Sequence, residues 1–175
     1  MENPKSSSTS IMLNYGLILG LTSIIINLMN FVFGDTYEPH WINSVVSILA
    51  TIIIIALGFK NIKHNNKGFL SLGEALKTGL GIALISGIVY VIYFYVFTNF
   101  IEPNYFVNLL KVQEVTMIET NPNLSDEQIE QGLAMMQKFS GFGMMSAIIM
   151  IMSLFFGFIV SLITGLIMKR VPEQD

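Results

Sequence analysis

Residues 141–168 read GFGMMSAIIMIMSLFFGFIVSLITGLIM, and this uncharged run ends at the adjacent cations Lys169 and Arg170. A helix needs roughly 17–25 predominantly apolar residues to cross about 30 Å of membrane hydrocarbon, and the run exceeds that length. A strand of a transmembrane barrel would instead alternate apolar and polar residues over about ten positions, which this run does not do. The segment therefore predicts a transmembrane helix with a sharp end at Lys169.

Three more stretches of the chain have the same character, at about 11–33, 41–59 and 74–98. Charged residues make up only 12% of the chain, against about 25% in soluble domains, and they cluster between the apolar runs. We therefore expect an all-α, polytopic membrane protein, a bundle of four transmembrane helices in one membrane domain that covers residues 1–175. Signal-peptide cleavage beside Val32 and Gly34 is the alternative for the first run, whose length favours a retained helix.

The basic residues fall mainly on one side of the predicted membrane. The N-terminal segment, the link between the second and third helices and the C-terminal segment share that side, and they carry seven of the nine Lys and Arg residues: Lys5, Lys60, Lys63, Lys67, Lys77, Lys169 and Arg170. The other side carries Lys111 and Lys138 together with most of the acidic residues: Asp35, Glu38, Glu102, Glu114, Glu119, Asp126, Glu127 and Glu130. Because Lys and Arg accumulate in cytoplasmic loops, we expect both termini in the cytoplasm.

The segment at about 104–139 is too long for a bare loop in so small a protein, and it predicts an external hairpin of two short helices. Pro103 disfavours a helical conformation at the residue before it, so the third transmembrane helix should end or kink there. Asn121-Pro122-Asn123 predicts the turn of the hairpin, and Ser125 has the spacing of a capping box that starts its second helix. The hairpin is either a binding surface for a partner or ligand, or an amphipathic connector at the membrane surface. The sequence favours the connector.

Small residues recur every four positions on two of the predicted helices. The third carries Ala75, Gly79, Ala83 and Gly87, the fourth carries Ser153, Gly157, Ser161 and Gly165, and the first adds Gly16 and Gly20. Small residues let helix backbones approach closely in a membrane. Both four-residue stripes lie in the cytoplasmic half, so we expect them to face each other within one chain. Association of several copies through one stripe is the alternative.

Asn27 and Asn30 are the most polar residues expected within the bilayer. They are candidates to line a solute path, but amides in a membrane more often bond to a neighbouring helix, here to Ser44 or Ser47. Glu74 is the third polar candidate, because an ionisable group beside a span can couple to proton or ion movement. Its position three residues after a serine also fits a capping box, and we favour that interpretation.

The chain lacks the residues that most catalytic and metal sites require. It has no cysteine, which excludes disulfides and thiolate chemistry, and His40 and His64 belong to loops on opposite sides of the membrane. The methionines between Met135 and Met152 could offer thioether ligands to copper(I), although adaptable packing explains them as well. There is no phosphate-binding loop or zinc-protease helix, and no basic stripe that would bind nucleic acid. We expect no enzyme, and no catalytic, cofactor-binding or metal-binding residue.

Four segments of the chain resemble a known family, small four-helix bacterial membrane proteins grouped as a domain of unknown function, number 4199, and typical of Bacteroidota. The segments are GFLSLGEA at 68–75, IEP at 101–103, LSDEQIEQ at 124–131 and MMQKF at 135–139. The resemblance covers nearly the whole chain and implies a location in the inner membrane, without any activity or catalytic residue. Gly132 departs from the better helix-forming residue expected at that position.

Two functions remain open from the sequence. The first is a non-enzymatic scaffold or accessory subunit in the lipid bilayer, which would contact a partner membrane protein through its small-residue faces and its hairpin. The second is a small oligomeric transporter or channel, built from several copies of the chain. An enclosed polar cavity containing Asn27, Asn30 or Glu74 would favour transport, whereas a dry and tightly packed centre would favour the scaffold.

Overall fold

The computed structural model describes residues 8–34, 36–37 and 40–171. Within these residues it contains six α-helices and one π-helical segment: α1 (Ser8–Phe33), α2 (Trp41–Asn65), α3 (Leu72–Val96), η1 (Phe97–Ile101), α4 (Tyr105–Thr120), α5 (Asp126–Phe139) and α6 (Phe142–Met168). Four helices, α1, α2, α6 and the continuous α3–η1 segment, are long and apolar enough to cross a membrane. The predicted all-α fold with four long apolar helices is confirmed.

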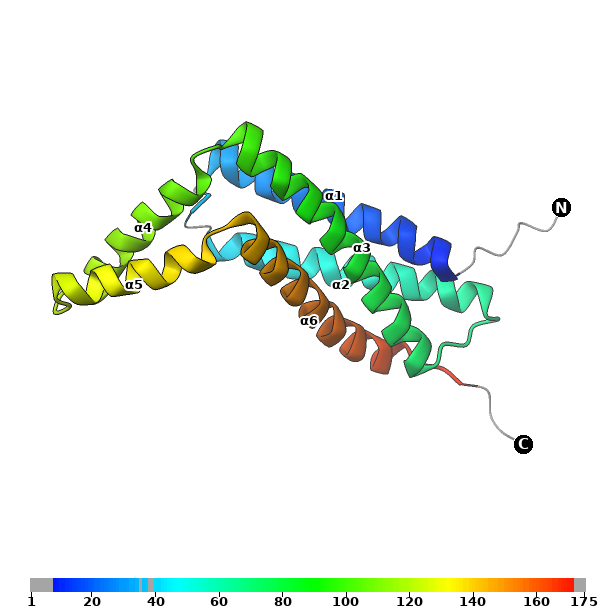
Figure 1. The fold of residues 1–175 in the computed structure, drawn as a ribbon. Helices are drawn as coiled ribbons and strands as arrows, with labels where there is room; N and C mark the ends of the chain where they lie inside the picture. Colours follow the sequence, from blue (N-terminus) through cyan, green and yellow to red (C-terminus); the bar gives the residue numbers. More distant parts are fainter. Residues whose placement is uncertain (1–7, 35, 38–39, 172–175) are drawn as a thin grey trace.

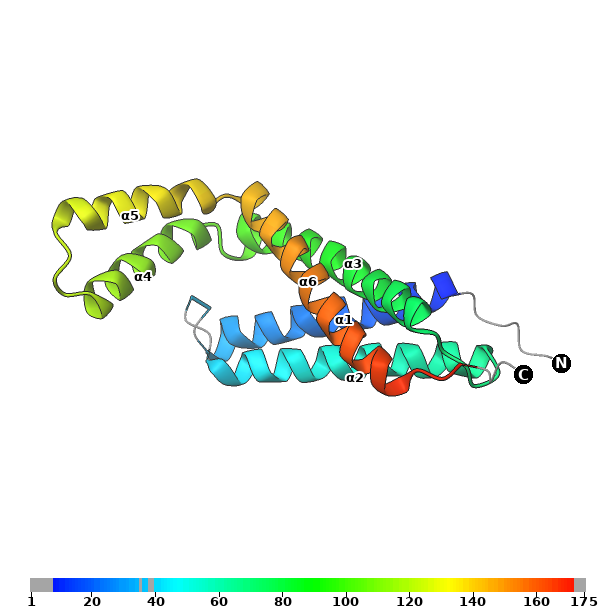
Figure 2. The same cartoon turned by 90° about the horizontal axis from the view of Figure 1, so that it is seen from below.

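Helix α3 lies between α1 and α6, and α2 packs mainly against α1 and α6 (Figures 1 and 2). In α1, α2 and α6 the buried residues gather toward the end of the bundle where α1 begins and α6 ends, whereas those of α3 run from Ala75 to Phe94. In α2 they run from Ile54 to Ile62, and in α6 from Gly157 to Gly165. Phe59, Ile55 and Ile82 are fully buried at the centre of this cluster. The first half of α2 and of α6 buries no residue, so the four helices pack most tightly at one end.

That same end of the bundle collects the basic residues. The start of α1, the end of α2, the start of α3 and the end of α6 lie together there (Figure 1). The basic residues at this end are Lys60, Lys63, Lys67, Lys77, Lys169 and Arg170. Leu70 and Arg170 exchange two main-chain hydrogen bonds, of 2.8 and 2.9 Å, and the Lys63 ammonium donates to the Met168 carbonyl at 3.0 Å. A cation at a helix C-terminus offsets the negative end of its dipole, so Lys63 stabilises the end of α6. Lys5, Asp35 and Glu38, which also contribute to the predicted charge difference across the membrane, lie outside the described residues.

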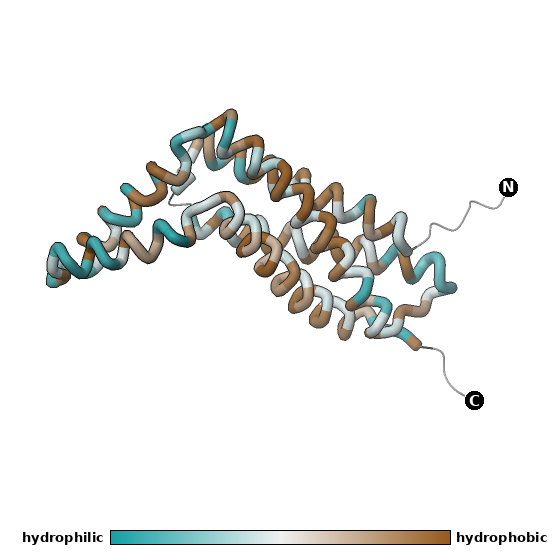
Figure 3. The backbone as a smooth tube through the Cα atoms, in the orientation of Figure 1, coloured by the Kyte–Doolittle hydropathy of each residue, from teal (hydrophilic) through white to brown (hydrophobic). Residues whose placement is uncertain are grey.

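Helices α4 and α5 form an antiparallel hairpin that projects from the opposite end of the bundle (Figures 1 and 2). Hydrophobic residues dominate the four long helices, whereas hydrophilic residues are more frequent toward the tip of the hairpin (Figure 3). The capping box predicted for the second hairpin helix is confirmed, since the Ser125 side chain accepts from the Gln128 amide and Gln128 returns the bond. α5 continues through Gly132, where an added Cβ would lie 2.6 Å from Cε of Met117. Gly132 therefore lies at the contact between α5 and the Met117 side chain of α4.

The end of α3 differs from the expectation in one respect. Glu102 is non-helical, with φ −132° and ψ 74°, as a residue before proline should be. However, the preceding turn is a π-helix, closed by a 2.8 Å bond from the Glu102 amide to the Phe97 carbonyl. α2 also continues past Phe59, the last residue of the predicted apolar run, and ends at Asn65. The hydropathy pattern marks where charge begins and does not show that Lys60 and Lys63 remain helical.

Candidate functional site

The small residues of α3 and α6 lie against one another. An added Cβ on Gly165 would lie 2.8 Å from Cβ of Ala75, and those on Gly79 and Gly157 would overlap Ser161 and Ala83. Further along the two helices, an added Cβ on Gly87 would meet the Ser153 side chain at 3.2 Å. Each member of one stripe thus faces a member of the other, at contact distances that larger side chains would prevent. The two stripes cover each other within a single chain.

Helix α1 uses its two small residues on another face of α3. An added Cβ on Gly16 would lie 2.6 Å from Cβ of Ile85, and one on Gly20 would lie 2.8 Å from Cβ of Val89. Both glycines are buried. α3 is therefore a central helix with a close contact to α1 on one face and to α6 on another.

The two asparagines of α1 both bond to neighbouring helices. The Tyr93 hydroxyl in α3 donates to the Asn27 side-chain oxygen at 2.8 Å, and the Asn43 side-chain NH2 group in α2 donates to the Asn30 side-chain oxygen. The prediction that these asparagines bond to Ser44 or Ser47 was wrong. Ser47 donates instead to the main-chain carbonyl of Asn43. Sequence reasoning missed Tyr93 because it belongs to an aromatic cluster, which suggests interfacial anchoring.

Glu74 lies in the first turn of α3, where it completes the helix cap. Its carboxylate accepts from the Ser71 amide at 2.9 Å and from the Ser71 hydroxyl at 2.8 Å, and the Asn66 side chain donates to its other oxygen at 3.0 Å. The Glu74 amide in turn donates to the Ser71 hydroxyl. The predicted capping box is confirmed, and both carboxylate oxygens are engaged at the loop end of the helix.

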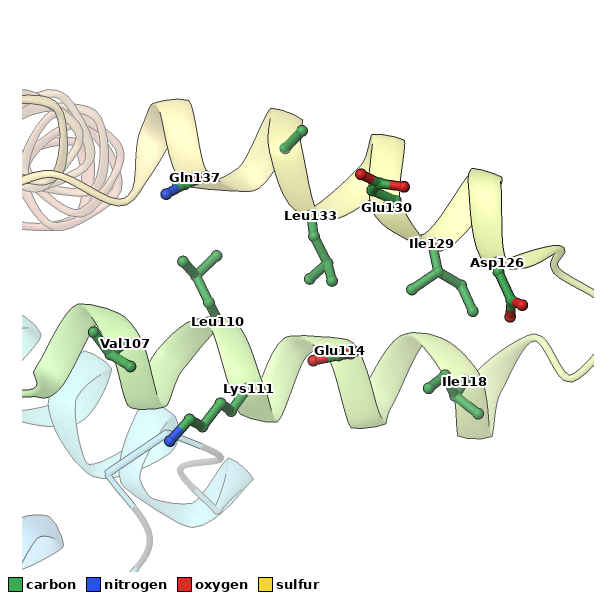
Figure 4. Close-up of a pocket in the computed structure, with 11 residues that line it drawn as sticks. Val107, Leu110, Lys111, Glu114, Ile118, Asp126, Ile129, Glu130, Leu133 and Gln137 are labelled. Carbon is green, nitrogen blue, oxygen red and sulfur yellow. The ribbon is translucent and has the colours of Figure 1, made fainter.

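Two grooves lie on the hairpin. The first, of about 790 Å³, is lined by α4 and α5 alone: Val107, Leu110, Lys111, Glu114, Ile118, Asp126, Ile129, Glu130, Leu133, Ala134 and Gln137 (Figure 4). The second, of about 440 Å³, also reaches α6: Leu109, Gln113, Gly132, Met135, Met136, Phe139, Ser140 and Met145. We call them the acid-rimmed groove and the methionine-rich groove. Across 8–34, 36–37 and 40–171, no group of three or more His, Asp or Glu residues could hold a metal ion.

The base of the hairpin is anchored to the bundle by aromatic rings. Phe94 of α3 contacts Tyr105 and Phe106 of α4 and Phe142 of α6, with ring centroids 5.6, 6.2 and 6.1 Å apart. Phe97 of η1 is buried and packs edge-on against Tyr105 at 5.8 Å. Burial, reinforced by the nearby Tyr37 hydroxyl, raises the pKa of Tyr105.

A polar triangle joins the same elements. The Glu102 carboxylate accepts from the Tyr37 hydroxyl at 3.2 Å and from the Asn108 side-chain amide at 3.0 Å, and the Asn108 amide lies 3.3 Å from the Tyr37 hydroxyl. Glu102 ends α3–η1, whereas Asn108 belongs to α4, so the triangle ties the first turns of the hairpin to the end of the bundle. Sequence reasoning used Glu102 only as the residue before a proline and missed this role.

One family model matches the chain, that of a protein of unknown function, DUF4199, over residues 14–170. The match covers most of the chain, which therefore belongs to this family. No curated protein and no solved structure matches it.

Proposed function

We propose that this member of the DUF4199 family is a non-enzymatic subunit of the bacterial inner membrane, a scaffold or accessory protein that contacts partner proteins. The observation that carries the proposal is the interlocking of the α3 and α6 stripes, in which Gly79 meets Ser161 and Gly157 meets Ala83. Packing at this distance supports a closed bundle between these helices. A closed bundle suits a protein whose working surface lies at its ends or its outer faces.

The polar groups support the same proposal. A transporter or channel needs polar groups that face a path across the membrane. Asn27 and Asn30 instead bond to Tyr93 and Asn43 on neighbouring helices, and Glu74 completes a helix cap.

The charge distribution supports an orientation with both termini in the cytoplasm. Six described Lys and Arg residues lie at the end where the α2–α3 loop meets the end of α6, and cytoplasmic loops are enriched in such residues. The hairpin projects from the other end and carries five carboxylates against two lysines. In this orientation the hairpin lies outside the cytoplasm.

The proposal is tested by affinity purification of the tagged chain in a mild detergent, followed by mass measurement of the intact complexes. A complex in which a different membrane protein accompanies the 19.5 kDa chain at fixed stoichiometry is the expected result. A lone monomer would contradict the proposal, and a complex of this chain alone would favour the oligomeric transporter. The same purification from cells that express the untagged chain is the control for background capture.

A further inference from the structure

The two faces of the hairpin differ in their chemistry. On α4, Lys111, Glu114 and Ile118 line the acid-rimmed groove at spacings of three and four residues, whereas Leu109 and Gln113 line the methionine-rich groove. Positions separated in this way lie on opposite sides of a helix with 3.6 residues per turn. The hairpin therefore has one carboxylate-bearing face and one face that is almost entirely apolar.

The methionine-rich groove is continuous with the apolar surface of the bundle. It includes Met145 in the first turn of α6, and its side chains Met135 and Phe139 are 65% and 49% exposed. An apolar face beside the outer end of a membrane-spanning helix settles favourably into the membrane interface. If this face meets lipid, the acid-rimmed groove faces away from the membrane.

The floor of the acid-rimmed groove has the form of an incomplete helical bundle. Leu110 of α4 points toward α5, and Ile129 and Leu133 of α5 point toward α4, in the space between the two helices (Figure 4). Ile118 at 47% and Val107 at 54% remain exposed along its length. Two antiparallel helices with an exposed apolar seam are completed by a third, whose apolar side chains recur at every third or fourth position.

The rim of the groove defines the charge of that third helix. Three of its lining residues are the exposed carboxylates Glu114, Asp126 and Glu130, against one cation, Lys111. A cationic helix would be complementary to this rim, and complementary charge increases both the association rate and the specificity of docking. A second copy of the hairpin would bring its own excess of carboxylates, and anionic lipid would be repelled in the same way.

We propose that the acid-rimmed groove binds a basic amphipathic helix of a partner protein on the outer side of the membrane. This inference rests on the proposed function and names the kind of partner that its hairpin would take. The apolar face of the partner helix would cover the seam between Leu110 and Leu133. Its Lys or Arg side chains would flank that face and meet Glu114, Asp126 and Glu130.

The test measures binding of a fluorescent model peptide to the full chain in nanodiscs of zwitterionic lipid. The peptide has the 16-residue length of α4, with leucines on one helical face and lysines elsewhere, and a second peptide replaces every lysine by glutamate. Neutralising the rim with Glu114→Gln and Glu130→Gln should weaken binding of the lysine peptide about tenfold, because two partly exposed charge contacts are removed. The matched control is Glu119→Gln with Glu127→Gln, which removes the same charge from hairpin positions outside the groove and should change the affinity less than about twofold.

Raising the salt concentration should weaken the wild-type complex more than the Glu114→Gln, Glu130→Gln complex, since screening acts only on the charge contacts. The proposal would be overturned if the rim variant and the control variant lost the same affinity for the lysine peptide. It would also be overturned if the glutamate peptide bound as tightly as the lysine peptide, or if the lysine peptide bound empty nanodiscs as tightly as those that hold the chain. Lipid in the groove would overturn it as well. That outcome would appear as quenching by brominated acyl chains of the fluorescence of the Ile118→Trp, Trp41→Phe variant, whose tryptophan is then the only one in the chain. If the peptide does not bind but a partner protein is co-purified, the groove proposal is wrong and the scaffold function stands. If the peptide binds but the chain is purified as a lone monomer, only the scaffold function is contradicted.

Discussion

The hydroxyl of Ser153 in α6 donates a 2.8 Å hydrogen bond to the main-chain carbonyl of Ala83 in α3. A carbonyl in the middle of a helix is normally covered by the side chains around it and engaged by its own helix. Here the facing residue Gly157 has no side chain, and an added Cβ there would overlap Ala83. The bond therefore reports how closely the two helix backbones approach, and it occurs at the contact on which the proposed closed bundle depends.

Gly79→Ala should destabilise the bundle. The added Cβ would overlap the Ser161 side chain, and overpacking a well-filled interface costs about 1–3 kcal/mol. The free energy of unfolding in mixed micelles titrated with SDS measures the effect. Gly73→Ala in the same helix is the control, because an added Cβ there has no neighbouring atom within 4 Å, and its stability should stay the same or rise slightly.

The same pair of positions allows a compensation experiment. Ser161→Gly removes the atoms that an alanine at residue 79 would meet, so the double variant Gly79→Ala, Ser161→Gly should recover most of the lost stability. Residues in contact show coupling energies of roughly 0.5–3 kcal/mol. Strictly additive losses in the double variant would mean that α3 and α6 do not meet at these residues.

The two serines of the α6 stripe should respond oppositely to alanine. Ser153→Ala removes the bond to Ala83 and should cost about 0.6 kcal/mol, the typical value for a hydrogen bond between membrane helices. The Ser161 hydroxyl is fully buried and has no hydrogen-bond partner within the described part of the chain. Because an unsatisfied buried hydroxyl is unfavourable, Ser161→Ala should leave the unfolding free energy unchanged or raise it. A larger loss at residue 161 than at residue 153 would contradict this assignment.

Glu102→Ala should loosen the base of the hairpin. The change removes both the acceptor for the Tyr37 hydroxyl and the acceptor for the Asn108 amide, each worth about 1 kcal/mol at a partly buried site. We expect hydrogen exchange to speed up several-fold at amides in the first turns of α4, while those of α3 keep their rates. Glu119→Ala, near the far end of α4, is the matched control and should leave the base of the hairpin unaffected.

Lys63→Ala should release the end of α6. Its ammonium bonds to the Met168 carbonyl at 3.0 Å, and a cation at a helix C-terminus contributes about 0.3–1 kcal/mol. Hydrogen exchange in the last turn of α6 is the measurement, and it should speed up in this variant. Lys60→Ala removes an exposed cation from the same helix, and equal effects of the two changes would indicate a general loss of charge instead of a lost cap.

Residues whose structure follows from local chemistry could be predicted from the sequence. The four apolar runs, and the caps at Ser71 and Ser125, depend on hydropathy and on contacts three residues apart, and the structure contains them. The stripe on α3 faces that on α6, as equal spacing and equal depth suggested. A four-residue period shows a contact face but does not show which helix covers it, so the packing of Gly16 and Gly20 on Ile85 and Val89 was not foreseen.

Features that depend on the arrangement of several helices could not be predicted. The partners of Asn27 and Asn30 are set by the angles between α1, α2 and α3, and the Lys63–Met168 contact joins residues far apart in the chain. The π-helical turn at Phe97–Ile101 accompanies the packing of Phe97 against Phe31 and Tyr105, which no sequence motif announces. The two grooves arise from the spacing between α4 and α5, whereas periodicity shows only that α5 has an apolar edge.

In the proposed orientation the hairpin and the basic end of the bundle lie on opposite sides of the membrane, and cysteine labelling tests this most directly. The chain has no cysteine, so Asn123→Cys at the exposed tip of the hairpin and His64→Cys at the exposed end of α2 each introduce a single thiol. A membrane-impermeant maleimide added to intact spheroplasts should label Asn123→Cys at once and His64→Cys only after lysis. Labelling of His64→Cys in intact spheroplasts, with Asn123→Cys protected until lysis, would contradict the orientation and with it the outward-facing binding surface.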